Sequence, residues 1–359
     1  QPGRVTREDA CGTCLPDLDN AGAARLDRRY TPLHGQRDMS VDAVITWVDG
    51  ADPAHRQKLD AWLAQSGMPR PATAEPTRFN DAGEIDWCIR SILRFAPWFR
   101  RIHVVVDAQT PAILQRLGAG GLADRFNIVD HREIFAGFEQ HLPTFNSRSI
   151  ISMLWRIEGL AENFVYFNDD MFLLRDVQAE DFFRDGCVVQ RGEWRRQAGN
   201  AWPARIMRQL KRLRGARADK VGNLDAQQLS ARIAGFEDRY YRLYHNPYPM
   251  RRSTLRTFFA EHPDLLASNC SHRLRSNVQF KTEALATHLE FLHHNAIADN
   301  RLHVVQLKPS EQHSSRVHRK MARADASDSS AFVCVQSLEL APAAVQQAII
   351  EWLDRRIGR

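Results

Sequence analysis

Short apolar runs alternate with amphipathic segments through the first half of the chain. Buried strands are predicted where β-branched and aromatic residues dominate, over 41–48, 102–107, 126–130 and 164–168. Helices are predicted between them, over 53–63, 83–95, 113–117 and 146–160. Within 83–95, one helical face carries Ile85, Cys88, Ile89 and Ile92. This alternation is typical of an α/β fold with a mainly parallel sheet and crossover helices.

The pattern changes after Phe183. Residues 191–245 are basic and amphipathic, helices are expected up to 262, over 272–292 and over 342–357, and the Ser-rich stretch 310–330 reads as a loop. The predicted organisation is a poorly ordered leader (1–38), an α/β core (39–185), a basic helical insertion (186–244), and the remainder of the core with C-terminal helices (245–359).

Carboxylates follow several of the predicted strands. Asn168-Asp169-Asp170 ends the most apolar strand, while Asp49, Asp107 and Asp130 end or follow the others. Two adjacent carboxylates repel each other, and a cation relieves that cost. Oxygen ligands of this kind suit Mg²⁺ or Mn²⁺, and ligands of open α/β sheets bind at the carboxyl ends of the strands. The alternative is a solvated turn in which Asp169 caps the next segment.

Charge is concentrated in one segment of the 359 residues. The net charge is +6, but residues 191–220 hold ten Lys or Arg against two acids, a balance of 10 − 2 = +8. Such a field attracts polyanions or an anionic membrane surface. No run of 18 apolar residues occurs. The six cysteines form no disulfide framework, Cys11 and Cys14 are assigned to a flexible tail, and a reducing cytoplasm is expected.

Four blocks of sequence carry a family resemblance. The first contains Trp47-Val48-Asp49-Gly50, and the second is long, from Arg78-Phe79-Asn80-Asp81 with Glu84 to Asn168-Asp169-Asp170. The third contains His245-Asn246-Pro247 and His272 to Ser276, and the fourth is Phe332-Val333-Cys334-Val335. Together they resemble the Stealth family of sugar-phosphate transferases. That family includes bacterial capsule-polymer enzymes and the lysosomal-enzyme N-acetylglucosamine-1-phosphotransferase.

The resemblance implies an activity and a set of site residues. The activity is transfer of a hexose-1-phosphate, with N-acetylhexosamine-1-phosphate favoured, from a UDP-sugar to an acceptor hydroxyl, which forms a phosphodiester and releases UMP. The implied core resembles the nucleotide-binding fold of GT-A glycosyltransferases, with Mg²⁺ or Mn²⁺ at Asp169 and Asp170. The implied catalytic residues are Asp170, His245 and Arg275. The implied substrate-binding residues are Trp47, Asp49, Gly50, Arg78, Asp81, Asp107, Gln109, Asn146, Asn168, Arg251 and His272.

The implied roles follow from side-chain chemistry. Asp170 would bind the metal or accept the acceptor proton, and His245 is the other candidate base because an imidazole titrates near pH 6.5. Arg275 would bind the transferred phosphate. The expected acceptor is an anionic polysaccharide or oligosaccharide held by 191–220, with no nucleic-acid partner. The expected location is the cytoplasm, and peripheral contact with the inner face of the cell membrane is a second possibility.

The sequence departs from the family pattern at two places, and it leaves three other functions as alternatives. Gln336-Ser337 stands where many members carry Asn-Asp, which puts one metal ligand in doubt, and Asp49 stands where Asn is common. The alternatives are a GT-A glycosyltransferase that releases UDP, a non-catalytic polyanion-binding protein and a nuclease with paired aspartates. The block with His245 and Arg275 favours phosphotransfer, and no helix-turn-helix or zinc-finger pattern supports nucleic-acid binding.

Overall fold

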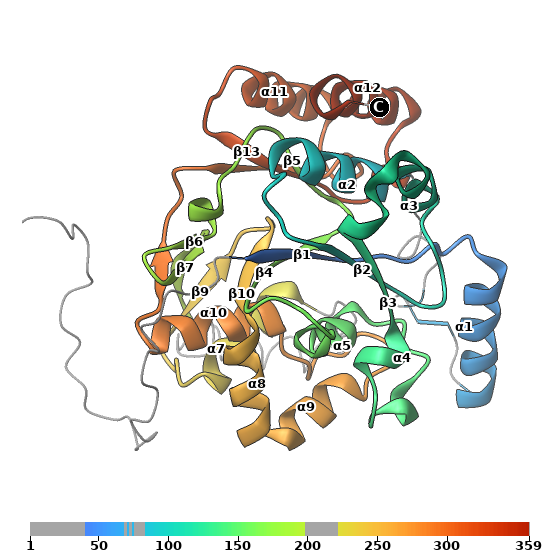
Figure 1. The fold of residues 1–359 in the computed structure, drawn as a ribbon, viewed down its shortest axis with the longest axis vertical. Coiled ribbons are helices and arrows are strands. Elements are labelled where there is room, and N and C mark those ends of the chain that lie inside the picture. The colour runs from blue at the N-terminus through green and yellow to red at the C-terminus, as the bar shows by residue number, and fades with distance from the viewer. Residues whose placement is uncertain (1–39, 68–69, 72–73, 75–82, 198–221, 359) are drawn as a thin grey trace, which may run out of the picture. The chain divides into compact units, whose positions relative to one another are not determined.

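A five-stranded, mostly parallel sheet forms the centre of the fold (Figure 1). The computed structural model describes residues 40–67, 70–71, 74, 83–197 and 222–358, which belong to one compact unit, Asp38–Arg359. Only the last strand in the sheet order is antiparallel to its neighbour. From one edge to the other the strands are β3 (Phe126–Asp130), β2 (Ile102–Val106), β1 (Val41–Thr46), β4 (Asn163–Asn168) and β10 (Tyr248–Arg251). The predicted α/β class with a mainly parallel sheet is confirmed.

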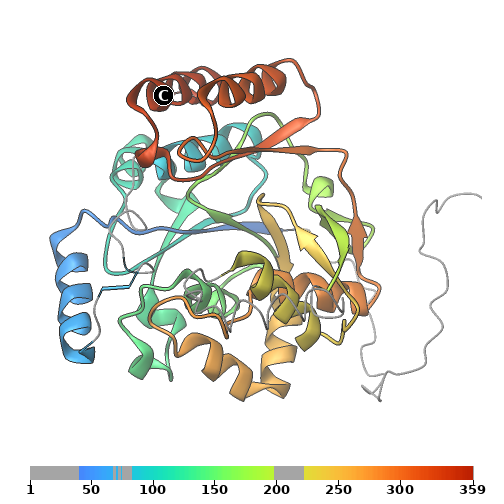
Figure 2. The ribbon, with the colours of Figure 1, turned by 180° about the vertical axis from the view of Figure 1, so that it is seen from behind.

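Helices cover both faces of this sheet, which is why its inner strands consist mostly of buried apolar residues. On one face lie α2 (Glu84–Phe95) and α12 (Ala343–Ile357); on the other lie α5 (Ser147–Ile151), α8 (Arg252–Glu261) and α10 (Thr282–Leu292) (Figures 1 and 2). The buried face of α2 contains the four apolar residues expected from its periodicity. The remaining described helices are α1 (Pro53–Ser66), α3 (Ala112–Leu117), α4 (His131–Ile134), α7 (Asn223–Ile233), α9 (Pro263–Cys270) and α11 (Ser314–Asp325).

The chain leaves the central sheet at Asp169-Asp170 and enters a second sheet. There β5 (Met171–Leu173) pairs antiparallel with β13 (Ser330–Val335), which pairs in parallel with β12 (His303–Leu307). Cys334 lies opposite Met171 in this register, and the Val335 amide donates to the Asp170 carbonyl at 3.0 Å. Residues 164 positions apart in the sequence therefore meet at the end of β4.

The region expected to be a basic helical insertion is partly strand. Its described part contains β7 (Cys187–Gln190) and the antiparallel pair β8 (Gly192–Arg196) and β9 (Arg239–Leu243). Helix α7 lies between β8 and β9 in the sequence. β7 pairs with β6 (Phe183–Arg184) and β11 (Ala296–Ala298). The ring centroids of Trp194 in β8 and Tyr241 in β9 are 5.4 Å apart. Packing between residues distant in the sequence therefore stabilises the strand conformation here. Residues 198–221, with most of the basic cluster, lie outside the described part, as do 1–39.

Three helix expectations were wrong. The predicted helix 146–160 ends at Ile151 and is followed by a single 3₁₀ turn, Leu154–Arg156. The helix predicted to open at His272 begins at Thr282, and a separate helix, α9, precedes it. The expected loop 310–330 contains α11, whose buried residues Val317, Met321 and Ala324 recur at helical spacing despite the polar composition. Among the described helices, none combines the length and hydrophobicity that a membrane crossing requires.

Candidate active site

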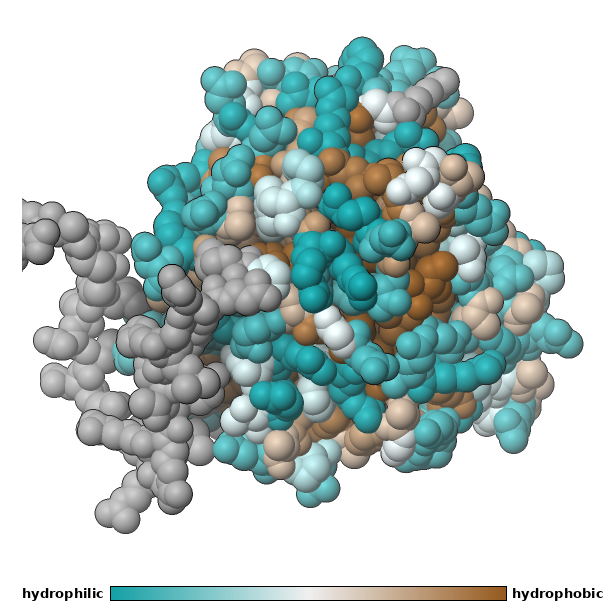
Figure 3. All heavy atoms as spheres, in the orientation of Figure 1, coloured by the Kyte–Doolittle hydropathy of each residue, from teal (hydrophilic) through white to brown (hydrophobic). Residues whose placement is uncertain are grey.

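A cleft of about 540 Å³ opens at the carboxyl ends of β1, β2 and β4. Its wall contains Trp47 after β1, Asp107 after β2 and the Asn168-Asp169-Asp170 turn after β4. Parallel strands deliver these residues to one edge of the sheet because their carboxyl ends coincide. Figure 3 shows one face of the protein, mostly hydrophilic at its periphery, with hydrophobic residues visible between the polar ones across its middle. The polar site predicted at the strand ends therefore has a cavity beside it.

The Asp170 carboxylate is largely buried and incompletely hydrogen-bonded. Its Oδ2 accepts from the Cys334 thiol at 3.3 Å. Its Oδ1 is buried and accepts no hydrogen bond from any residue that the structure describes. Burial raises the pKa of Asp170 to about 6, although the hydrogen bond from Cys334 opposes that change. A carboxylate with so few hydrogen bonds is able to bind a cation or a proton.

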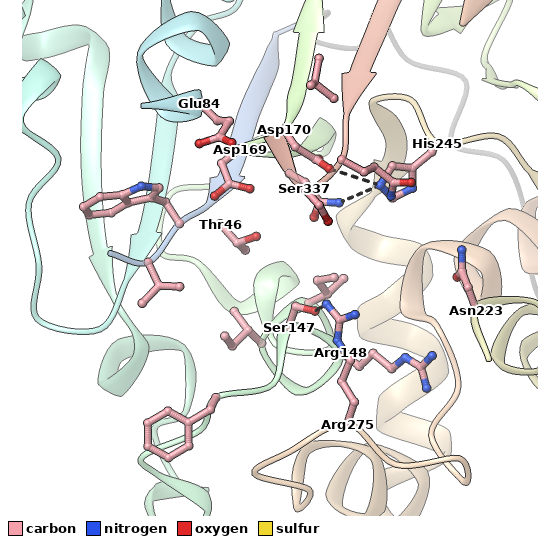
Figure 4. A pocket seen from close by; sticks show the side chains of 18 of the residues that line it. Thr46, Glu84, Ser147, Arg148, Asp169, Asp170, Asn223, His245, Arg275 and Ser337 are labelled. Carbon is pink, nitrogen blue, oxygen red and sulfur yellow. Dashed lines mark hydrogen bonds and ion pairs between the residues drawn. The ribbon is translucent and has the colours of Figure 1, made fainter. Parts of the chain in front are cut away.

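His245 lies next to Asp170, on the other side of the turn (Figure 4). Its Nε2 is 3.9 Å from Asp170 Oδ2 and 3.5 Å from the Asn168 side-chain amide, while its Nδ1 is 3.1 Å from the Tyr248 hydroxyl. Burial lowers the pKa of His245 to about 3, with Lys281 and Arg275 adding to the effect. The imidazole is thus neutral at pH 7, well below the unperturbed pKa expected from the sequence.

Cationic side chains line the cleft across from the acidic turn. Arg148 and Arg275 project from the floor in Figure 4, opposite Asp169 and Asp170. Arg148 is almost fully buried and donates to the Ser276 carbonyl at 3.0 Å, while Arg275 donates to the Ser147 hydroxyl at 2.7 Å. Lys281 also lines the cleft and pairs with Glu283 at 2.7 Å. Cations facing carboxylates across a cavity suit a phosphate group that bridges to a metal ion.

The other end of the cleft is built around Asp107. Lys58 donates to Asp107 Oδ1 at 2.9 Å, and His55 Nδ1 lies 3.9 Å from Oδ2. Burial alone would raise the pKa of Asp107, but His55 and Lys58 hold it well below its usual range. His131 is buried beside them, and burial lowers its pKa to about 4. The edge of the Phe145 ring contacts His55 at 5.4 Å between centroids.

The predicted site residues divide into three groups. Those that line the cleft are Trp47, Asp107, Asn168, Asp169, Asp170, His245 and Arg275. Those that the structure places outside its lining are Asp49, Gly50, Gln109, Asn146, Arg251 and His272. Arg78 and Asp81 lie outside the described residues.

Most residues outside the lining have structural partners. Gln109 accepts from the Asp49 amide at 2.9 Å and joins two strand-end loops. Asn146 is fully buried, caps α5 and donates to the His272 carbonyl at 2.8 Å. Arg251 is buried against Glu290 at 3.3 Å. These side chains shape the elements that carry the site.

Several residues of the cleft were absent from the predicted set. They are Glu84, His55, His131, Arg148 and Lys281. Glu84 and Arg148 lie in or beside sequence blocks that carry the family resemblance, so the signal for them was available. His55, His131 and Lys281 had none, because each lies on an element brought to the cleft only by folding.

The fourth sequence block reaches the cleft without the carboxylate common in the family. Gln336 and Ser337 line the cleft, and Gln336 accepts from the Gln306 amide at 3.0 Å. Ser337 has φ +55°, in the left-handed region that a non-glycine residue rarely adopts. Glu84 and Glu339 also line the cleft, and Figure 4 shows Glu84 beside Asp169. Glu84 therefore supplies a further carboxylate on the side of the cleft where Asp169 lies.

Two segments of the chain match family models. Residues 39–67 match Stealth protein CR1, conserved region 1, and residues 78–190 match Stealth protein CR2, conserved region 2. The second of these contains the Asn168-Asp169-Asp170 turn, and the first contains Trp47.

Relatives and solved structures show further similarity. An exopolysaccharide phosphotransferase of Streptomyces coelicolor is 38% identical over 242 residues, 66% of this chain and 40% of that protein. A capsular polysaccharide phosphotransferase of Actinobacillus suis is 36% identical over 155 residues, 43% of this chain and 40% of that protein. The galactosyltransferase LgtC, solved with donor and acceptor sugar analogues, aligns over 88% of this chain and 96% of its own at 11% identity and a TM-score of 0.42.

The chain thus spans about 40% of the length of these two relatives. The resemblance inferred from the sequence blocks is confirmed. By its two conserved regions, the chain belongs to the Stealth family.

Proposed function

We propose that this chain transfers a hexose-1-phosphate, with N-acetylhexosamine-1-phosphate favoured, from a UDP-sugar to a hydroxyl of a polysaccharide acceptor and releases UMP. The observation that carries the proposal is the cleft itself, where Asp169, Asp170 and His245 face Arg148 and Arg275. A diphosphate needs cations on one side, and an acceptor hydroxyl needs a proton acceptor on the other. The polysaccharide phosphotransferases among the relatives support the same reaction class.

The residues present fit a divalent cation. Asp170 Oδ1 is buried without a hydrogen bond from the described residues, and Asp169, the preceding residue, also lines the cleft. Asp169 and Asp170 would hold Mg²⁺ or Mn²⁺, which prefer such oxygen donors. When bound, the ion would neutralise charge on the diphosphate.

Side chains of this chain would bind the phosphoryl group and accept the proton of the acceptor hydroxyl. Arg275 and Arg148 would bind the oxygens of the transferred phosphoryl group, where charge develops. His245 Nε2 would take the proton of the acceptor hydroxyl as that oxygen bonds to phosphorus. The P–O bond to the nucleoside monophosphate then breaks, and UMP leaves with the bridging oxygen. Burial is the main cause of the low pKa of His245, and Lys281 and Arg275 add to it; the donor's negative charge would offset the contribution of these two cations and so raise that pKa.

The acceptor and the location follow as part of the proposal. An anionic polysaccharide would be attracted by the basic segment 191–220, although Arg191 of that segment is buried over the Phe332 ring. Such an acceptor and a UDP-sugar donor would meet in the cytoplasm, at the inner face of the membrane.

The nucleotide product tests the proposal. The purified chain is incubated with a panel of UDP-sugars, Mg²⁺ or Mn²⁺ and oligosaccharide acceptors, and the nucleotides are separated by chromatography. UMP in a one-to-one ratio with a product that carries phosphate is expected, and its release should fall sharply in Arg275→Ala. Stoichiometric UDP with a phosphate-free product would instead mean attack at the sugar carbon, the glycosyltransferase reaction.

A further inference from the structure

Three donors of different chemistry meet at the end of β4. Asp170 Oδ2, His245 Nε2 and Cys334 Sγ all lie within 4.8 Å of one another. Asp170 Oδ2 is 3.3 Å from Sγ and 3.9 Å from Nε2. Ligand atoms around a tetrahedral Zn²⁺ are about 3.3 to 3.8 Å apart, because zinc–ligand bonds are about 2.0 to 2.3 Å long. Small side-chain movements would bring all three atoms to a single ion.

The backbone holds the thiol against the carboxylate. Cys334 is fully buried in β13, and its register places it opposite Met171, the residue after Asp170. The Val335 amide donates to the Asp170 carbonyl at 3.0 Å, and this hydrogen bond also holds β13 beside the start of β5. The thiol therefore closes the inner side of the cluster, while Asp170 and His245 line the cleft on its open side.

The far nitrogen of His245 has the partner that a metal-bound histidine requires. The Tyr248 hydroxyl is 3.1 Å from Nδ1, and Tyr248 is itself buried. A hydroxyl that accepts the Nδ1 proton leaves the Nε2 lone pair directed at Asp170 and Cys334. Metal-bound histidines almost always hydrogen-bond through the other ring nitrogen in this way, and that bond fixes the tautomer and the ring orientation.

We propose that Asp170, His245 and Cys334 form a zinc site with three protein ligands and a fourth position open to the cleft. Sulfur and nitrogen donors favour Zn²⁺, whereas Mg²⁺ prefers oxygen, so this mixed set differs from the oxygen donors of Asp169 and Asp170 Oδ1. On binding, the Cys334 thiol releases its proton to solvent and the thiolate bonds to the ion. The proposal rests on donor geometry alone. Because the ion would occupy His245 Nε2, we expect Zn²⁺ to inhibit the proposed transfer.

Cobalt reports this site directly, because Co²⁺ replaces Zn²⁺ and absorbs light when it bonds to a thiolate. The full chain carrying Cys11→Ser and Cys14→Ser, which removes the other thiol pair, is titrated with Co²⁺ without oxygen. We expect a thiolate-to-cobalt band that saturates at one ion per chain, is abolished by one equivalent of Zn²⁺ and persists in excess Mg²⁺. Cys334→Ser in this background should abolish the band and raise the Kd for Zn²⁺ at least about tenfold.

The matched control is Cys187→Ser in the same background. Cys187 is half-buried in β7 and is not one of the clustered donors, so its loss should leave the band unchanged. Absence of the band in the chain with Cys334 intact, or a full band in Cys334→Ser, would overturn the site. If Cys334→Ser does not fold, as judged by circular dichroism, His245→Gln serves as the second variant and should weaken Zn²⁺ binding to a similar extent. A cobalt band in a chain that transfers no sugar phosphate would leave the site standing and refute only the proposed function.

Discussion

Two carboxylates lie near opposite ends of the paired strands β1 and β4, Asp42 fully buried and Asp170 largely buried, and they have opposite environments. Asp42, in β1, accepts from Arg100 at 2.9 and 2.6 Å, from His103 at 3.1 Å and from the Ala161 amide at 2.8 Å. Burial alone would raise its pKa, but these donors hold the pKa well below its usual range. Asp170 has one thiol donor and an unpaired Oδ1, among the described residues, and its pKa is raised to about 6.

The difference distinguishes a carboxylate that the fold fully compensates from one that it does not. Asp42 lies within β1 and Asp170 follows β4, and the apolar residues of both strands are buried. A buried charge is tolerated in a stable fold when donors surround it, as they do Asp42. Asp170 lacks that compensation, which fits a residue whose partners are a ligand or a cation.

The largest expected effect is on turnover in Asp170→Asn. We expect the rate of UMP release, with Mg²⁺ or Mn²⁺ present, to fall at least about 10³-fold, because both metal binding and charge stabilisation are lost. Thermal stability without metal should hold or rise, since an unfavourable buried charge is removed. The exposed Asp176→Asn is the control. Turnover near that of the unmodified chain would refute the role of Asp170.

Asp42→Asn should show the reverse pattern. Asp42 is buried and accepts from three residues, so its replacement leaves Arg100, His103 and the Ala161 amide without their acceptor. Because Arg100 is partly exposed and can bind water instead, we expect a loss of about 1 to 3 kcal/mol in the free energy of unfolding. Urea unfolding followed by circular dichroism measures it. The turnover per folded molecule should stay within about twofold. A stability loss confined to a few tenths of a kcal/mol would mean that Asp42 is not the structural member of the pair.

Stability should also depend on pH with opposite signs at the two sites, measured with a chelator present. The folded pKa of Asp42 lies below its unfolded value of about 3.9, so its stabilisation is present above that pH and is lost as pH falls through the folded pKa. The folded pKa of Asp170 is about 6, so its ionisation opposes folding above pH 6 and that cost disappears as pH falls toward 4.

The two variants separate these contributions. The stability advantage of Asp170→Asn over the unmodified chain should grow by up to about 2 kcal/mol from pH 4 to pH 7. The deficit of Asp42→Asn should stay constant from pH 5 to 8 and shrink below about pH 4. Parallel pH profiles for the two variants would show that the environments do not differ as described.

The smallest expected effect is that of Tyr248→Phe. Loss of the hydrogen bond to His245 Nδ1 should cost about 1 kcal/mol in orienting the imidazole, which corresponds to a five- to tenfold fall in kcat, with the donor KM unchanged. Tyr244→Phe, outside the cleft lining, is the control. A changed KM with constant kcat would assign Tyr248 to substrate binding instead.

Sequence pattern predicted the central strands well because they are short, continuous runs of β-branched and aromatic residues, and it predicted α2 well because its apolar residues repeat at the helical period. It failed for α11, because only three of the residues of this mostly polar helix are buried. It also failed for β8 and β9, which pair across more than forty intervening positions. Local propensity says little about such elements, since their conformation depends on partners distant in the chain.

For the site, the sequence by itself determined the Asn168-Asp169-Asp170 turn, the blocks with His245 and Arg275 and the family to which they belong. The tertiary structure decided which carboxylate is compensated and which is not, because that depends on donors from other strands. It brought His55, His131, Arg148 and Lys281 to the cleft and placed Cys334 beside Asp170. Such contacts arise from strand order and register, which fix distances between residues that no pattern along the chain relates.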